Sequence, residues 1–370
     1  MRSVNIRYMP AVDHLRAYAA LLILFYHGLH LLSYHARFHR DFGIDHWLQP
    51  GNPLLAALAE GHTAVALFMV LSGFILMRGA LETGVDYGRF LRNRLLRTYP
   101  LFLLLVAAGV AAAPRFEWPA LLQTVSGFAN LPGALVAPPF TSLLWTIAIE
   151  WQFYVLFPLL VAVLKPAWTR PLLGLLAVLL VFRGFAVFAG GNARDFSYMT
   201  LLGRLDQFLL GMWAAWFFHA HPPAPRRGAL LAGAALLAIV AALWGFNAAG
   251  GWPLMAWWKA VWPTVEGALW TAFVVGYVAC ADRAEGRVSR ALAAVGVISY
   301  SIYLTHFVVI HTMVRLDLVP APTGDAVADA LFGTLLVALP TTLALSALTY
   351  RFVELPFLRL RSRYRRDAEA

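Results

Sequence analysis

Apolar residues in this chain occur in long blocks, separated by short polar segments that are rich in proline and glycine. A helix that spans a bilayer needs about 20 predominantly apolar residues. The blocks predict membrane-spanning helices at about residues 12–33, 58–79, 94–113, 142–164, 171–189, 200–219, 229–247, 258–280, 291–314 and 328–350. The pattern therefore predicts an all-α integral membrane protein with about ten transmembrane helices.

Positive charge is distributed unevenly over the segments that connect these blocks. Lys and Arg collect in the cytoplasmic loops of membrane proteins. If the chain starts in the cytoplasm, 20 of its 29 Lys and Arg residues fall in inside segments and eight in outside segments, with Arg16 within a span. This asymmetry predicts that both termini are cytoplasmic. Residues 1–370 then form one membrane domain, with helices over about 12–350 and a basic cytoplasmic tail over 351–370.

The composition agrees with lipid as the main solvent. Hydrophobic residues make up 61% of the chain and charged residues 13%, whereas soluble domains have about 25% charged residues. Cys280 is the single cysteine, which excludes a disulfide within the chain and a zinc site with several thiolates. The net charge of +10 lies mainly in loops, where it indicates topology rather than nucleic-acid binding. The apolar stretch 15–26 lacks a clean cleavage site, so we expect a permanent first helix rather than a signal peptide.

Two ionisable residues lie in the first predicted helix. Arg16 and His27 are eleven residues apart, which is close to three helical turns, so they share a face and are separated by about 16 Å along the axis. Ionisable groups at membrane depth usually face a cavity or a partner. The pair would reach two ends of one long ligand. Alternatively, Arg16 extends to the membrane interface and His27 is a core histidine with its hydrogen bonds satisfied.

A carboxylate lies within the fourth predicted helix. Glu150 is about 12 Å below the outer end of that helix, near the predicted depth of His27. A buried carboxylate needs a partner or a proton, and the candidate partners are His27, Arg204 and His306. The alternative is a structural ion pair between helices.

Small and basic residues follow in the second helix and after it. Ser72 and Gly73 fall near mid-membrane, where they indicate either a packing face of small residues or close backbone access for a thin ligand. The next segment carries a dense basic cluster: Arg89, Arg92, Arg94 and Arg97. Such a cluster is explained by topology or anionic lipid contact, or by a docking site for a phosphorylated ligand, because guanidinium groups bind phosphate through two hydrogen bonds.

Further polar and aromatic residues lie in the predicted helices, those of the ninth helix at a depth similar to that of His27. They are Trp145 in the fourth helix, Arg204 and Asp206 in the sixth, and Tyr300, Tyr303 and His306 in the ninth. The outer segment 244–262 is rich in tryptophan. Tryptophans at this depth are typical of an interfacial belt, and a platform for a sugar is the alternative.

Six stretches, taken in order, resemble the membrane acyltransferase-3 family. They are Val12-Asp-His-Leu-Arg16 through Leu24-Phe-Tyr-His27, Phe68-Met-Val-Leu-Ser-Gly-Phe74, Arg92-Asn-Arg-Leu-Leu-Arg-Thr-Tyr-Pro100, Trp145-Thr-Ile-Ala-Ile-Glu-Trp-Gln-Phe-Tyr154, Ile298-Ser-Tyr-Ser-Ile-Tyr-Leu-Thr-His306 and Val353-Glu-Leu-Pro-Phe357. The resemblance runs from about residue 10 to 360. His14, Tyr18, Trp151 and Leu355 depart from the family's usual residues, whereas Glu150 is retained.

The resemblance implies transfer of an acyl group, often acetyl, from cytoplasmic acyl-CoA to an extracytoplasmic or lipid-linked saccharide. It also implies a multi-pass protein of the bacterial cytoplasmic membrane. Some relatives carry a further C-terminal extracytoplasmic hydrolase-like domain, which we do not expect here. Acyl-CoA would act as a co-substrate, and we expect no permanently bound cofactor, no metal and no nucleic-acid partner. Membrane lipids are the other expected partners, and the oligomeric state stays open.

The residues can then be given expected roles. His27 would be the general base, because a neutral imidazole can accept a hydroxyl proton near pH 7, with Glu150 and Arg16 also catalytic. The acyl-CoA site would comprise Arg16, Ser72, Gly73, Arg89, Arg92, Arg94 and Arg97. The acceptor site would comprise Trp145, Arg204, Asp206, Tyr300, Tyr303 and His306.

Two other classes of protein share parts of this pattern. A transporter or flippase for a glycolipid would have the same polar cavity but no thioester chemistry. A haem-binding redox protein would need paired axial histidines on facing helices, and eleven histidines are present.

Overall fold

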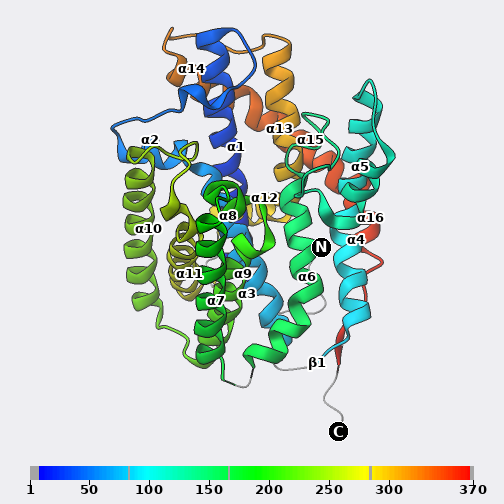
Figure 1. The fold of residues 1–370 in the computed structure, drawn as a ribbon, viewed down its shortest axis with the longest axis vertical. Coiled ribbons are helices and arrows are strands. Elements are labelled where there is room, and N and C mark those ends of the chain that lie inside the picture. Colours follow the sequence, from blue (N-terminus) through cyan, green and yellow to red (C-terminus); the bar gives the residue numbers. More distant parts are fainter. Residues whose placement is uncertain (1–7, 82–83, 166, 283–285, 367–370) are drawn as a thin grey trace.

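The protein is a bundle of helices, described here from a computed structural model over residues 8–81, 84–165, 167–282 and 286–366 (Figure 1). The α-helices are α1 (Pro10–Phe38), α2 (Pro53–Ala59), α3 (Ala64–Ala80), α4 (Tyr87–Ala112), α5 (Trp118–Gln123), α6 (Leu144–Leu164), α7 (Thr169–Phe188), α8 (Ala193–Met199), α9 (Leu201–Ala220), α10 (Pro225–Ala248), α11 (Trp262–Ala281), α12 (Arg287–Val297), α13 (Ser299–Arg315), α14 (Ala326–Gly333), α15 (Leu339–Thr349) and α16 (Leu355–Leu358). Short 3₁₀ segments are η1 (Ile44–His46), η2 (Gly61–Thr63) and η4 (Trp257–Ala260), and π-helical segments are η3 (Thr124–Phe128), η5 (Thr334–Ala338) and η6 (Tyr350–Glu354). Two short strands, β1 (Gly84–Val85) and β2 (Arg365–Arg366), pair antiparallel.

The all-α membrane fold predicted from the sequence is confirmed. In the described part of the chain, eight helical segments are long and apolar enough to cross a bilayer, and the bent pair α12–α13 raises this number to nine. The remaining predicted span is α9, which is helical over 20 residues but carries Arg204, Asp206 and Gln207 in its first two turns. All three side chains are buried, so α9 lies inside the bundle rather than against lipid.

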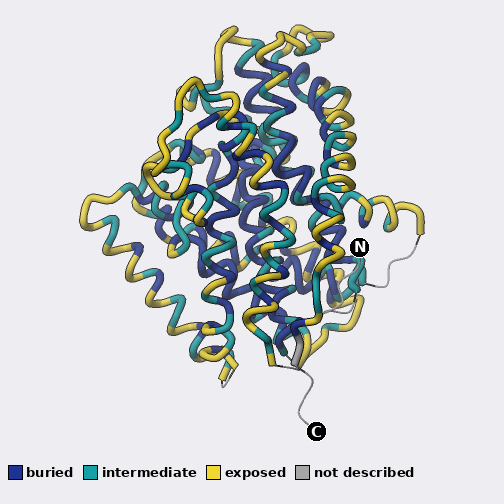
Figure 2. The backbone as a smooth tube through the Cα atoms, turned by 90° about the vertical axis from the view of Figure 1, so that its right-hand side faces the viewer, coloured by how far each residue is buried: buried dark blue, intermediate teal, exposed yellow. Residues whose placement is uncertain are grey.

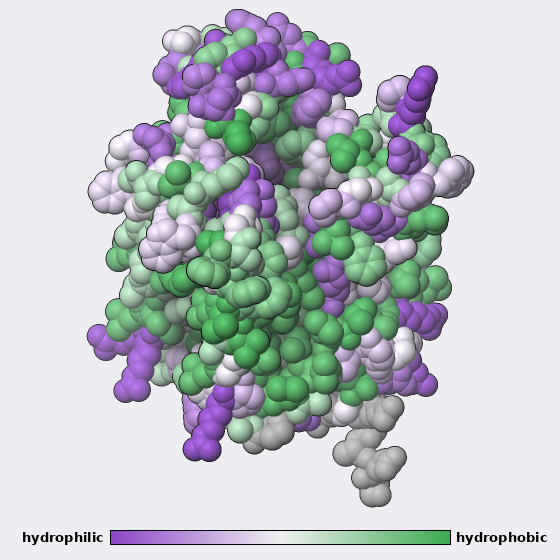
Figure 3. Space-filling model, viewed as in Figure 1, coloured by the Kyte–Doolittle hydropathy of each residue, from purple (hydrophilic) through white to green (hydrophobic). Residues whose placement is uncertain are grey.

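The surface of the bundle matches this assignment. On the face drawn in Figure 3, an apolar band crosses the middle of the molecule between a hydrophilic cap and hydrophilic patches at the opposite rim. Buried residues concentrate in the centre of the bundle, and exposed residues follow the outer helices (Figure 2). The outer helices are apolar on the side that faces away from the bundle: on α7, Val181 and Phe185 are 72% and 65% exposed. Lipid is the environment in which such exposure is favourable.

Helices α3 and α9 pack with their backbones in close contact. A Cβ atom at Gly73 would clash with the carbonyl oxygen of Phe208 in α9, and one at Gly211 would clash with the carbonyl oxygen of Val70 in α3. Each glycine therefore lies against the backbone of the facing helix, as small residues do in membrane helix pairs. Gly73 thus packs helices together and does not line a cavity.

A buried ion pair joins three helices. The Nη2 atom of Arg183 in α7 lies 2.9 Å from Oδ2 of Asp206 in α9, and the same Arg183 atom donates to Thr264 of α11. Both side chains of the ion pair are fully buried. Removing one partner of such a pair leaves an uncompensated charge, so the pair makes the helix arrangement specific.

The ninth predicted span, 291–314, is not one continuous helix. Helices α12 and α13 are bent by 69° at Ile298, and α12 packs across the start of α1. At the bend, Gly296 lies against the backbone of Asp13, and the His14 ring is 3.0 Å from the carbonyl oxygen of Ser289. The bend therefore follows from close packing against α1.

The predicted tail over 351–370 begins as a continuation of the last helical segment. The last span continues as a helical segment through η6 and α16 to Leu358, and β2 then pairs with β1. The residues 1–7 and 283–285, which contribute to the predicted charge asymmetry, lie outside the described residues, as do 367–370. In Figure 1, β1 and the α9–α10 connection lie at one end of the bundle, whereas the start of α14 lies at the opposite end. The predicted inside and outside segments are thus separated, and which end is cytoplasmic stays a prediction.

Candidate active site

Two cavities lie within the bundle and share lining residues. The first, here called the basic cavity, has a volume of about 110 Å³ and is lined by Arg16, Arg94, Arg97, Ser72 and Glu150 among other residues. The second, here called the aromatic cavity, has a volume of about 530 Å³ and is lined by His27, Trp47, Trp145, Tyr198 and Trp252 among others. Val65 and Tyr303 line both. The two cavities are therefore adjacent, and Val65 and Tyr303 lie between them.

Three arginines and one carboxylate define the basic cavity. Arg16 comes from α1, Arg94 and Arg97 are one turn apart on α4, and Glu150 comes from α6. Arg16 pairs with Asp13 at 3.3 Å, and Arg97 pairs with Glu354 at 3.3 Å. Arg94 is thus the cavity arginine that has no carboxylate partner among the ion pairs of the described residues.

Glu150 has a different partner from those that the sequence indicated. Its Oε1 atom accepts a hydrogen bond of 2.7 Å from the Ser72 hydroxyl. The two side chains face each other across the basic cavity from α6 and α3. His27, Arg204 and His306, the predicted partners, line the aromatic cavity or lie beside it. Glu150 and His27 were predicted at similar depth, but Glu150 lines the basic cavity and His27 lines the aromatic cavity, so the two side chains do not meet.

The predicted arginine cluster divides into two groups. Arg94 and Arg97 line the basic cavity. Arg89 and Arg92 are exposed, and Arg89 lies 3.6 Å from Asp86. Neither Arg89 nor Arg92 is among the residues that line the described cavities, so of the predicted cluster Arg94 and Arg97 belong to the candidate site.

His27 is part of a chain of hydrogen bonds that sets its tautomer. His306 Nδ1 lies 2.9 Å from the carbonyl oxygen of Ile302, and His306 Nε2 lies 2.8 Å from His27 Nδ1. A carbonyl only accepts, so Nδ1 of His306 carries the proton, and Nε2 of a neutral His306 must then accept from Nδ1–H of His27. Nε2 of a neutral His27 is left unprotonated. This is the protonation state that a general base requires.

Aromatic rings surround the histidines of the aromatic cavity. The Tyr26 ring lies within contact of His27, His30 and His62, with ring centroids 4.8, 5.1 and 5.9 Å apart. The His30 ring stacks on Trp47 at 4.1 Å. Flat rings with polar edges are suited to the apolar faces and hydroxyl groups of a carbohydrate.

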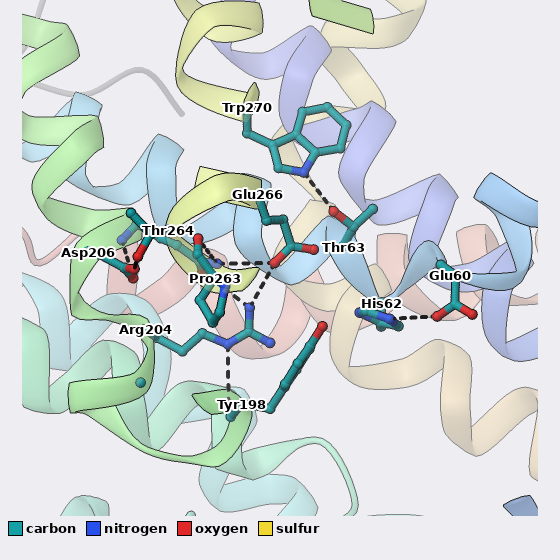
Figure 4. Close-up of polar contacts among 12 residues, drawn as sticks. Glu60, His62, Thr63, Tyr198, Arg204, Asp206, Pro263, Thr264, Glu266 and Trp270 are labelled. Atoms are coloured by element: carbon teal, nitrogen blue, oxygen red, sulfur yellow. Dashed lines mark hydrogen bonds and ion pairs between the residues drawn. The ribbon is translucent and has the colours of Figure 1, made fainter. Parts of the chain in front are cut away.

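Arg204 lines the aromatic cavity, whereas Asp206 does not. Arg204 lies 3.4 Å from Glu266 and stacks 4.2 Å over the Tyr198 ring (Figure 4). Asp206 accepts hydrogen bonds from Arg183 and Thr264 instead. It is thus a structural residue of the buried ion pair described above.

Three buried polar atoms near Arg204 are left without a partner. Within the described residues, the Tyr198 hydroxyl, His62 Nδ1 and Glu266 Oε1 make no hydrogen bond. Figure 4 shows the Tyr198 hydroxyl pointing into the space between Glu266 and His62. Unsatisfied buried polar atoms are costly, and a ligand or water with hydroxyl groups would satisfy them.

Three other predicted acceptor residues line one cavity or both. The place where Val65 and Tyr303 line both cavities is here called the junction. Trp145 lines the aromatic cavity, Tyr303 lines both cavities, and Tyr300 lines the basic cavity only. The hydroxyl groups of Tyr303 and Thr146 are 3.0 Å apart at this junction. Tyr300 donates to the carbonyl oxygen of Thr98 at 2.6 Å.

Some residues of the site were missed in the sequence. His30 lies three residues after His27, on the same face of α1. This spacing could have predicted that His30 faces the same cavity as His27. His62 and Tyr198 lie in short segments before α3 and α9, where no periodicity marks them. Several histidines gather here, but no group of three or more His, Cys, Asp or Glu side chains is placed to hold a metal ion in the part of the chain that is described.

Comparison with known proteins agrees with this architecture. Residues 9–351 match the family Acyl_transf_3, described as an acyltransferase domain. A protein of Komagataeibacter xylinus described as a "putative membrane-bound transacylase BcsY" is 29% identical over 276 residues, which are 68% of this chain and 66% of that protein. The match thus spans just under two thirds of the relative's length, and no solved structure matches this chain. The chain is a multi-pass membrane protein and belongs to the acyltransferase-3 family.

Proposed function

We propose that the protein transfers an acyl group, in the first instance acetyl, from acyl-CoA in the basic cavity to a hydroxyl group of a saccharide or glycolipid in the aromatic cavity. The observation that carries this proposal is that a cavity lined by arginines lies next to a cavity lined by aromatic residues, with Val65 and Tyr303 lining both. The reaction would take place in the bacterial cytoplasmic membrane, with the donor entering from the cytoplasm. The name of the relative, a membrane-bound transacylase, agrees with such a transfer.

The donor side has the charge that acyl-CoA requires. Arg94 and Arg97 would bind its phosphates, because guanidinium groups form paired, charge-assisted hydrogen bonds with phosphate oxygens. The pantetheine arm would pass Arg16 and Ser72, along the wall formed by α1 and α3. Its thioester would then reach the junction at Tyr303.

The acceptor side has the polar atoms that a polyol requires. The Tyr198 hydroxyl and His62 Nδ1 are buried, and both residues line the aromatic cavity. Trp47, Trp145 and Trp252 supply flat apolar surfaces in the same cavity. The hydroxyl groups of a saccharide would form hydrogen bonds with the two buried polar atoms, and its ring faces would pack on the tryptophans.

The chemical step follows from the position of His27. Nε2 of His27 takes the proton of the acceptor hydroxyl while the oxygen attacks the thioester carbonyl carbon. The developing oxyanion receives a hydrogen bond from the Tyr303 hydroxyl at the junction. The C–S bond then breaks, CoA leaves as a thiolate, and the imidazolium returns the proton to it. His306 accepts the Nδ1–H bond throughout and stabilises the charged ring.

The proposal is tested by thiol release from acetyl-CoA. Purified protein in lipid vesicles is supplied with acetyl-CoA, with and without a saccharide and glycolipid extract of the source membrane. We expect thiol release that depends on the extract, and acetyl label in the extract. Absence of thiol release with several acyl-CoA donors would contradict the proposal and favour the transporter or flippase. A Soret band in the absorption spectrum of the purified protein would favour the alternative of a haem-binding redox protein.

The same assay distinguishes direct transfer from a relay. In direct transfer, labelled acetyl-CoA alone leaves no label on the protein after rapid denaturation. In a relay, His27 would carry the acyl group, and the label would be trapped on the peptide that contains it. We expect direct transfer, because Nε2 of His27 is in the state of a base and the two cavities hold both substrates together.

A further inference from the structure

The C-terminal segment lies along the start of α4, beside the basic cavity. Asn93 Nδ2 donates to the carbonyl oxygen of Ser362 at 2.6 Å, and the Ser362 N–H donates back to Asn93 Oδ1 at 3.0 Å. The Asp86 N–H donates to the carbonyl oxygen of Tyr364 at 2.8 Å, and the Tyr364 ring lies 5.5 Å from the Phe90 ring. The segment therefore runs antiparallel to the first turns of α4 in a fixed register.

This register places Arg361 next to the arginines of the cavity. Residue 362 is bonded to Asn93, and Glu354, seven residues before Arg361, pairs with Arg97 at 3.3 Å. Arg361 thus lies between these two anchors, alongside Arg94. Burial, together with the positive charges of Arg97 and Arg94, lowers the pKa of the Arg361 guanidinium to about 10.

Within the described residues, neither Arg94 nor Arg361 forms an ion pair with a carboxylate, whereas Arg16 and Arg97 do. Glu354 is fully buried and already bound to Arg97 and Ser301. Among the residues that the structure describes, Nε of Arg94 is buried and has no hydrogen-bond partner, and the guanidinium lies over the Phe90 and Tyr154 rings. Close guanidinium groups repel one another, and an anion held between them removes the repulsion.

We propose that Arg361, together with Arg94, forms a phosphate-binding site beside the basic cavity, so that the C-terminal segment is part of the donor site. Under the proposed function, on which this inference rests, the phosphate belongs to the nucleotide end of acyl-CoA. The same chemistry would bind the phosphate of an anionic lipid headgroup. The two sources can be separated, because pantetheine lacks the nucleotide phosphates and a zwitterionic bilayer lacks the anionic headgroup.

The test is a set of binding measurements on the full chain in phosphatidylcholine nanodiscs. Arg361→Gln removes the charge, and Arg359→Gln is the matched control, because Arg359 is exposed two residues earlier on the same segment. We expect Arg361→Gln to weaken CoA binding about 10-fold, as loss of about 1.4 kcal/mol does, and to leave pantetheine binding unchanged. Arg359→Gln should stay within about twofold of wild type for both ligands.

Further variants separate binding from folding. Arg361→Lys keeps the charge and should recover part of the affinity, and the melting temperature of each variant shows whether it folds. If Arg361 and Arg94 hold one phosphate, the loss in Arg361→Gln/Arg94→Gln is smaller than the sum of the single losses. Additive losses would contradict a shared site.

The outcomes also separate this inference from the proposed function. Wild-type protein that binds no CoA contradicts the proposed donor. Loss of stabilisation by phosphatidylglycerol in Arg361→Gln, with CoA affinity unchanged, supports the phosphate site with a lipid as its source. Wild-type behaviour of Arg361→Gln towards both CoA and phosphatidylglycerol overturns the inference.

Discussion

The hydrogen bond between His306 and His27 gives the sharpest prediction. If His306 holds the tautomer of His27 and stabilises its charged form, His306→Ala removes a hydrogen bond to a charged ring in the transition state. Such bonds contribute about 1.5–3 kcal/mol, and each 1.36 kcal/mol corresponds to about a tenfold change in rate. We therefore expect kcat to fall about 10- to 150-fold.

The separate effects of His306→Ala on kcat and on KM show whether His306 positions the base or binds a substrate. Because His306 is bonded to His27 and is not among the residues that line either cavity, KM for acetyl-CoA should change little. His306→Gln keeps an acceptor oxygen near the position of Nε2 and should recover part of kcat. The assay is thiol release at saturating acceptor, with the melting temperature as the control for folding.

Two results would refute this reasoning. One is a folded His306→Ala variant with kcat within about twofold of wild type. The other is a loss that appears only in KM, because a positioning residue for the base acts on the chemical step. A double variant with His27→Ala should lose little more than His27→Ala alone, since both residues act as one unit.

Three further predictions concern packing, the ion pair and the acceptor. Gly73→Ala should destabilise the protein by about 1–3 kcal/mol through overpacking, measured as a lower melting temperature, whereas Gly184→Ala, with open space around its Cβ position, should not. Arg183→Leu should destabilise by about 3–5 kcal/mol, because it leaves Asp206 as an uncompensated buried charge; unchanged stability would contradict this. Tyr198→Phe should raise KM for the acceptor without changing KM for acetyl-CoA, and an equal change in both would argue against a role on the acceptor side.

The fold was predictable largely because lipid imposes a simple rule on sequence. Spanning helices must be long and apolar, so the blocks between the breakers marked the helices. The rule fails where a helix is surrounded by protein: α9 tolerates Arg204 and Asp206 because they find partners in neighbouring helices. The bend at Ile298 was missed because it arises from contact with α1, which periodicity does not report.

The site was predictable in its residue types but not in its pairings. Depth along a helix follows from residue number, so His27 and His306 were expected at a similar level. Rotation about each helix axis depends on packing with other helices, and it separates Glu150 from His27. Two departures from the family pattern also find partners: the His14 ring contacts Ser289, and Trp151 donates to Thr98 at 2.8 Å.

The central claim is that His27 takes the proton of the acceptor hydroxyl. The most direct test is acyl-CoA-dependent labelling of saccharide and glycolipid in membranes that contain wild type or His27→Ala at equal amounts. The account predicts label in the saccharide or glycolipid fraction with wild type, and loss of nearly all of it with His27→Ala while CoA binding is retained. Equal labelling by the two proteins would contradict a role of His27 in the chemistry.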